Sequence, residues 1–258
     1  MAKCDIVLSD KLLKLYLNFK EGLVTNSREL NRVQSLLVFF KPYLTNKRQY
    51  DAINRELPKD LHTQLLASGI DDDLTELQLA SKTRMKLILT ENENCKAYPY
   101  LCINGEDRIE INYTGSFKKV LRSKCIEHIK ALCETASRVS VYDKYLCKPE
   151  NFTSGIVDKF FRLFERNAKI DLEIHLPFNA EKLAVQRQEL TTWWNTNSVT
   201  YSNVKLDHHQ VDEQEDFHDR YMRIISPTGN VEVILSSGFE YLFNDEKDFT
   251  YLIRALKK

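Results

Sequence analysis

The strongest constraint on the fold is the alternation of strand-like and helix-like segments in the second half of the chain. Residues 138–142 (R-V-S-V-Y) and residues 169–176, in which apolar and polar residues alternate strictly, are typical of strands. Amphipathic segments with helical spacing of the apolar residues occupy 152–166 and 180–194. This order of strand, helix, strand and helix predicts a βαβ core with parallel strands.

Further strand-like segments extend this core on both sides. Those that follow it in the sequence predict a hairpin-like return, so the sheet is expected to be mixed but mostly parallel, with helices against it. A helix is predicted over 121–135. The other predicted strands are 85–89, 98–103, 109–113, 204–208, 217–225, 231–235 and 249–253.

The first 83 residues have a different pattern, from which we expect a helical N-terminal region over 1–83 before an α/β domain over 84–258. Ser9 is placed to cap the first helix, Pro58 to begin another, and Asp71–Asp73 to form the acidic first turn of a third. Such amphipathic helices bury their apolar faces against one another, and they are also where we expect a protein partner to bind.

Composition excludes several classes of protein. The 258 residues contain 37 Lys+Arg and 37 Asp+Glu, so a uniformly basic nucleic-acid coat and an acidic tail protein are both excluded. No apolar run approaches the roughly 20 residues that span a bilayer, and the N-terminus lacks the features of a signal peptide. The six cysteines form no C-x-x-C pair, which predicts free thiols and no zinc site. We therefore expect a soluble cytoplasmic protein with neither metal nor cofactor.

Two loops follow predicted strands at the edge of the sheet where α/β proteins bind ligands. They are Asp143-Lys144-Tyr145 and Ser236-Ser237-Gly238. In the segment F-H-D-R-Y, His218 and Arg220 are two residues apart and would project from the same face of a strand. A guanidinium holds phosphate oxygens and an imidazole can attack phosphorus, so this pair predicts a phosphate site with a nucleophile. The alternative is a buried His-Asp-Arg network that only joins strands.

The segments F-H-D-R-Y-M-R-I and V-E-V-I-L-S-S-G-F-E-Y-L resemble the phospholipase D-like superfamily, in its single-half form with an H-D-R motif. The resemblance covers roughly 84–258 and extends to the C-terminal domain of MIT-domain proteins and to standalone bacterial members. It implies that His218 is the nucleophile and that Arg220 takes the place of the phosphate-holding lysine. It further implies that Ser236 and Ser237 fall where the phosphate-contacting hydroxyl would be. Either Asp143 or Asp219 would have to orient an imidazole.

The chain departs from the superfamily pattern in three ways. Arg220 replaces the lysine, Ile225 stands where the motif has an aspartate, and the motif occurs once rather than twice. Two functions therefore remain open. The first is a metal-independent nuclease that forms a phosphohistidine, with a role in bacterial defence implied by the resemblance. The second is a non-catalytic module that binds phosphate, lipid or protein. A single motif predicts a homodimer in which two copies of His218 share one cleft.

The charges near the predicted site have opposite signs. The basic residues that could track a nucleic-acid backbone are Lys118, Lys119, Arg122 and Lys124, together with Lys144 and Lys148 in the loop after the first core strand. Of these, Lys144 would approach the site. The acidic run Asp212–Asp216 directly precedes the H-D-R motif. It is either a solvated connection between strands or an electrostatic guard of the site.

Overall fold

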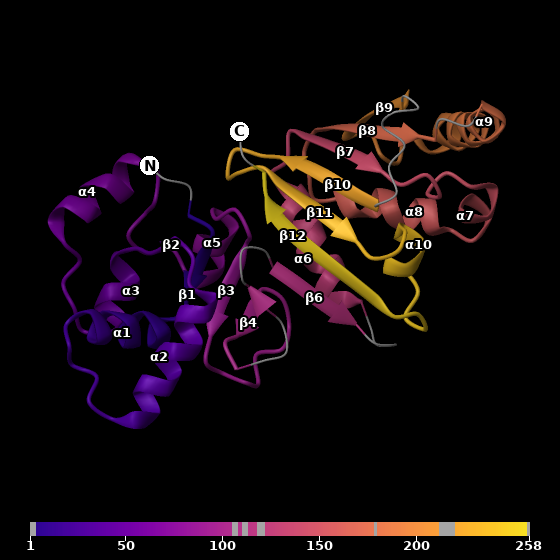
Figure 1. The fold of residues 1–258 in the computed structure, drawn as a ribbon. Coiled ribbons are helices and arrows are strands. Elements are labelled where there is room, and N and C mark those ends of the chain that lie inside the picture. The colour runs from indigo at the N-terminus through magenta and orange to yellow at the C-terminus, as the bar shows by residue number, and fades with distance from the viewer. Residues whose placement is uncertain are drawn as a thin grey trace. The chain divides into compact units, whose positions relative to one another are not determined.

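The computed structural model describes residues 4–104, 108–109, 113–117, 122–177, 180–211 and 220–256. The chain forms two compact units, unit 1 over Met1–Tyr113 and unit 2 over Thr114–Lys258 (Figure 1). Among the described helices, none is both long and apolar enough to cross a membrane.

Unit 1 contains a small parallel sheet with the strand order β2-β1-β3-β4. Its central strand β1 has the sequence I-V-L and is fully buried, as expected for a parallel strand that is covered on both faces. The segment before Ser9, predicted as part of a helix, is this strand. The sheet consists of β1 (Ile6–Leu8), β2 (Tyr43–Leu44), β3 (Leu87–Thr90) and β4 (Tyr100–Cys102).

The helices of unit 1 occupy much of the region that was predicted to be helical, and some of their caps are as expected. The Ser9 hydroxyl accepts the Leu12 N–H and caps α1. Asp71–Asp73, however, do not begin a helix, because Thr75 and Gln78 form a capping box that starts α5 at Glu76. The helices are α1 (Asp10–Lys20), α2 (Ser27–Phe39), α3 (Lys47–Ala52), α4 (Lys59–Ala67) and α5 (Glu76–Ser81), and a short strand β5 (Arg108–Ile109) follows β4.

The boundary between the two compact units lies after Tyr113, whereas the change in sequence pattern lies near residue 83. The physical reason is strand pairing, since β3 pairs with β1 and β4 pairs with β3. Residues 87–102 therefore complete the sheet of unit 1. The assignment of 1–83 and 84–258 as separate functional domains stays a prediction.

Unit 2 contains the mixed sheet predicted from the alternating segments. Its strands run in the order β6-β12-β11-β10-β7-β8-β9. The βαβ core is confirmed, because β7, β8 and β9 are parallel, and the return is antiparallel through β10, β11 and β12. The strands are β6 (Tyr113–Phe117), β7 (Arg138–Tyr142), β8 (Ile170–Leu176), β9 (Val204–Gln210), β10 (Arg220–Ile225), β11 (Val231–Leu235) and β12 (Phe249–Ala255).

Figure 1 shows α6, α8 and α10 against one face of this sheet. An aromatic cluster lies in this layer, where Phe160 of α8 makes edge contacts with Phe164 and with Phe239 of α10. The single helix predicted over 152–166 is divided, because Gly155 has a left-handed backbone (φ 76°) that starts α8 anew. The helices are α6 (Ser123–Glu134), α7 (Pro149–Thr153), α8 (Ile156–Phe161), α9 (Ala180–Asn197) and α10 (Phe239–Leu242), with a 3-10 turn η1 (Arg162–Phe164).

The cysteines are free thiols, as predicted. Cys125 and Cys133 are buried on α6, and Cys147 is buried in the loop between β7 and α7.

Candidate functional site

Asp143 connects the two loops that were predicted to form the site. Its side chain follows β7 and is 1% exposed. Oδ1 accepts the Tyr145 N–H at 2.9 Å, and Oδ2 accepts the Phe239 N–H at 2.9 Å. Because Tyr145 lies after β7 and Phe239 begins α10 after β11, one carboxylate holds both loops in place.

Gly238 lies directly against this carboxylate. A Cβ atom at position 238 would come within 2.8 Å of Asp143 Oδ2. The backbone of Gly238 is extended (φ −65°, ψ 174°), a conformation that any residue adopts. Glycine is therefore required here for space and not for backbone freedom.

Arg220 is at the start of β10, next to the end of β7. The antiparallel register pairs Tyr221 with Tyr142 and Arg220 with Leu235, which places Arg220 opposite Asp143. The guanidinium carbon of Arg220 lies 5.0 Å from the centroid of the Tyr145 ring. Among the described residues, Arg220 makes no hydrogen bond or ion pair, although its Nε is buried.

Arg223, on the same strand, shows the contrast. Its Nε donates to Glu232 at 2.9 Å, whereas the Arg220 guanidinium lies over the Tyr145 ring and makes no hydrogen bond to a residue that the structure describes. A buried guanidinium nitrogen without a hydrogen-bond acceptor is costly, and an anionic ligand would supply one.

The pKa of Asp143 is shifted upward from its ordinary value. Burial of the carboxylate is the main cause; the N–H donors of Phe239 and Tyr145 and the positive charge of Arg220 act in the opposite direction. The site therefore contains a desolvated carboxyl group whose two oxygens are already used by backbone donors.

The two serines after β11 differ in their contacts. Ser236 is exposed and is tied to β12, because its N–H donates to the Thr250 carbonyl and its Oγ accepts the Thr250 N–H, both at 2.9 Å. The Ser237 side chain is half-buried and makes no hydrogen bond to a described residue. Of the two predicted phosphate contacts, Ser237 therefore has the more available hydroxyl.

Three cationic side chains lie near the aromatic ring of Tyr145. The Lys148 Nζ lies 4.2 Å from the ring centroid and the Lys144 Nζ lies 5.8 Å from it, in addition to the Arg220 guanidinium at 5.0 Å. This central role of Tyr145 was not predicted. Its only signal in the sequence is its place between two lysines in a loop after a strand, and the convergence with Arg220 requires the sheet.

Arg122, predicted to be part of a basic surface patch, is instead buried and donates to the carbonyl oxygens of Asn244 and Lys247, so it cannot track a nucleic-acid backbone. Lys124 lies in the first turn of α6 and is half-buried.

The other predicted site residues lie outside the described part of the chain. These are His218, Asp219, Lys118, Lys119 and the acidic run Asp212–Asp216. The structure thus brings Asp143, Arg220 and the two loops together, while the role of His218 and the orientation of an imidazole by Asp143 stay predictions.

Comparison with known proteins adds information about the fold. No protein-family model matches the chain. No curated protein matches it either. Among solved structures, polyphosphate kinase from Porphyromonas gingivalis is similar with a TM-score of 0.33 and 11% identity over 56% of this chain and 23% of that chain. A variant of yeast tyrosyl-DNA phosphodiesterase is similar with a TM-score of 0.29 and 15% identity over 54% of this chain and 31% of that chain.

Over about half its length, the chain is thus similar to these two solved structures, at 11% and 15% identity. It spans about a quarter to a third of the length of these matched proteins. At TM-scores of 0.25–0.33 the likeness carries no argument about the site or its chemistry. The functional argument therefore rests on the residues of this chain.

Proposed function

We propose that unit 2 binds a phosphodiester beside Arg220 and hydrolyses it, with nucleic acid as the substrate. The observation that carries this proposal is the guanidinium of Arg220, which has a buried Nε and no hydrogen bond or ion pair to any described residue. Phosphodiester oxygens match the planar donors of a guanidinium. The Ser237 hydroxyl is the second donor in the proposed contact.

The positive charges around Tyr145 support a polyanionic substrate. Lys144 and Lys148 lie on the same ring as Arg220, so neighbouring phosphates of one strand would each meet a cation. A nuclease is favoured over a lipase for this reason. The role in bacterial defence stays an implication of the sequence resemblance.

The proposed reaction has two steps at His218. A ring nitrogen of the neutral imidazole attacks phosphorus, the P–O bond to the leaving group breaks, and a phosphohistidine forms. Water then attacks this intermediate, the P–N bond breaks, and a phosphomonoester and the free imidazole result. The leaving oxygen needs a proton in the first step, and water must lose one in the second.

A homodimer would supply the group that transfers these protons. An imidazole bonded to phosphorus cannot act as the acid, and a two-fold axis through the site would bring in the same histidine from a second copy. We therefore propose a shared cleft that contains His218 and Arg220 of both chains. Mixing His218→Ala chains with wild-type chains should then lower activity by more than dilution does.

The test is hydrolysis of a bis-aryl phosphodiester and cleavage of DNA in the presence of EDTA. Wild-type protein should be active, and His218→Ala should be inactive. His62→Ala is the matched control. This variant also removes one imidazole, but His62 pairs with Asp72 in unit 1 and not in the proposed site. Equal rates for wild type and His218→Ala would refute the proposed chemistry.

The second candidate is a phosphate-binding module without catalysis. Ile225 stands where the superfamily has an acidic residue, and the lack of that residue favours this function. In the sheet, Ile225 of β10 pairs with Arg138 of β7. In that case the wild type would bind DNA or a phosphodiester without cleaving it, and Arg220→Gln would weaken binding while His218→Ala would not.

A further inference from the structure

The backbone of the loop that follows β7 is held in place on both sides of Tyr145. The Tyr145 N–H donates to Asp143 Oδ1 at 2.9 Å, and the Tyr145 carbonyl accepts a hydrogen bond from Asn151 Nδ2 at 2.8 Å. Both partner side chains are buried, Asp143 at 1% and Asn151 at 4% exposed. The carbonyl of Lys144 accepts a further hydrogen bond, at 3.0 Å, from the buried side chain of Gln186 on α9. Three buried side chains therefore fix the backbone of this loop.

The side chain of Tyr145 has no comparable hydrogen bond. Its hydroxyl makes none to any residue that the structure describes, although the side chain is half-buried. Its ring lies instead beside cations, and the guanidinium carbon of Arg220 is 5.0 Å from the ring centroid. Because an aromatic face attracts a guanidinium, the anchored loop presents to Arg220 a ring in a fixed position.

Arg220 has no other group that fixes its guanidinium. Its Nε is buried, yet the guanidinium makes no hydrogen bond or ion pair with a described residue. Arg223 on the same strand is held differently, because Glu232 accepts its Nε–H at 2.9 Å in an ion pair. An arginine side chain has several rotatable bonds, and fixing it on a ligand costs rotamer entropy. A ring that already orients the guanidinium removes part of that cost.

We propose that Tyr145 is a positioning residue for Arg220, which it orients toward a phosphodiester oxygen of the substrate. This role rests on the proposed function, which assigns the phosphate contact to Arg220. The ring attracts the cation without accepting its N–H groups, so these stay free for an anionic ligand. A carboxylate in the place of the ring would also orient the cation, but it would occupy these donors, as Glu232 does for Arg223.

The test measures binding of a short fluorescein-labelled oligothymidylate by fluorescence anisotropy, in EDTA and at low ionic strength. The His218→Ala chain is used throughout, so that the oligonucleotide stays intact. Tyr145→Leu should weaken binding about three- to thirtyfold, the range expected for loss of a cation–π contact. Tyr145→Phe keeps the ring and should bind as tightly as the chain with Tyr145, because the hydroxyl makes no hydrogen bond to a described residue.

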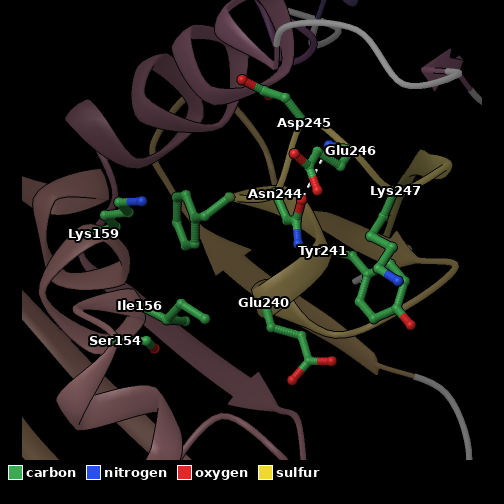
Figure 2. A pocket seen from close by; sticks show the side chains of 10 residues that line it. Ser154, Ile156, Lys159, Glu240, Tyr241, Asn244, Asp245, Glu246 and Lys247 are labelled. Atoms are coloured by element: carbon green, nitrogen blue, oxygen red, sulfur yellow. Dashed lines mark hydrogen bonds between the residues drawn. The ribbon is translucent and has the colours of Figure 1, made fainter.

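Tyr241→Leu is the matched control for the loss of a ring. Tyr241 is also a half-buried tyrosine of unit 2, but it lines a cavity of about 560 Å³ between α8 and the segment 240–247 (Figure 2). The ring contact of Arg220 is with Tyr145, so Tyr241→Leu should leave the affinity unchanged. Urea unfolding of each variant checks that the fold is retained.

A double-mutant cycle separates positioning from direct stacking of a base on the ring, which aromatic side chains provide in many proteins that bind single strands. Arg220→Gln should by itself weaken binding at least tenfold. In the Arg220→Gln chain, Tyr145→Leu should have no further effect, because the ring acts through the guanidinium. A loss of the same size with and without Arg220 would mean that the ring contacts a base or acts through Lys148, and it would overturn the positioning role.

Two other outcomes also count against this role. If Arg220→Gln weakens binding and Tyr145→Leu does not, or if Tyr145→Phe binds as weakly as Tyr145→Leu, the positioning role is wrong while the proposed function stands. If the oligonucleotide does not bind, or binds equally well to Arg220→Gln, the proposed function is wrong and the positioning role fails with it.

Discussion

The contact between Gly238 and Asp143 makes a quantitative prediction about the stability of unit 2. In Gly238→Ala, the new Cβ would lie 2.8 Å from Asp143 Oδ2, so one of the two groups must move by several tenths of an ångström. Asp143 cannot move freely, because its oxygens accept the Tyr145 and Phe239 N–H groups at 2.9 Å. Overpacking of this kind costs about 1–3 kcal/mol, and we expect Gly238→Ala to be destabilising by that amount.

A double-mutant cycle tests whether the cost arises from this contact. Asp143→Ala leaves the buried Phe239 N–H without its acceptor, at about 1–3 kcal/mol, and the half-buried Tyr145 N–H at a smaller cost. Removal of a buried carboxylate partly offsets these costs. In the double variant the added methyl group of residue 238 no longer meets a carboxylate. The two changes should therefore cost less together than the sum of their separate costs, with a coupling of about 1–2 kcal/mol.

The assay is urea unfolding of the full chain, followed by fluorescence and circular dichroism so that separate unfolding of the two units is detected. Gly155→Ala is the matched control in the same unit. Gly155 has a φ of 76° and no atom within 4 Å of a Cβ, so its cost of about 1–2 kcal/mol is conformational. It should add to the cost of Asp143→Ala without coupling. If the costs of Gly238→Ala and Asp143→Ala add to within about 0.5 kcal/mol, the steric argument is wrong.

Three further predictions concern charge. Because burial raises the folded pKa of Asp143, its contribution to stability is greatest below the unfolded pKa of about 3.9 and declines as pH rises through the folded pKa. In measurements of the free energy of unfolding at several pH values, Asp143→Asn should remove this decline. Burial lowers the folded pKa of His175, so its contribution to stability is fully present above about 6.5 and is lost as pH falls through the folded pKa. An NMR titration of the His175 ring should show a midpoint below that of histidine in an unstructured peptide, and a midpoint at or above that ordinary value would contradict this. Arg220→Gln should reduce phosphodiester binding at least tenfold with little loss of stability. Arg223→Gln should leave binding unchanged and lower the free energy of unfolding by about 1 kcal/mol only, because Glu232 keeps Arg254 as a partner. Equal effects of the two variants on binding would argue against a ligand at Arg220.

The sequence alone predicted the elements whose pattern is local. β7 and β11 have the bounds that their residues indicated, and the strict alternation in 169–176 appears as β8 with its apolar residues buried. Such predictions succeed because the period of apolar residues reflects the direction of each side chain, which neighbouring residues determine. The placement of Asp143 and of the Ser236-Ser237-Gly238 loop at one edge of the sheet, after the two strands that flank β10, followed from the same reasoning.

The tertiary structure decided what depends on pairing between distant segments. The sequence predicts a helical region over 1–83 that includes the short strand β1, because three apolar residues have no period of their own and only pairing with β2 and β3 makes them a strand. The position of Arg220 over the Tyr145 ring, and the need for glycine at 238 beside Asp143, likewise arise from segments that meet across the sheet. Residue types and spacing determine which groups can take part in a site, but close contacts between residues about 75 to 95 positions apart are set by strand register and packing.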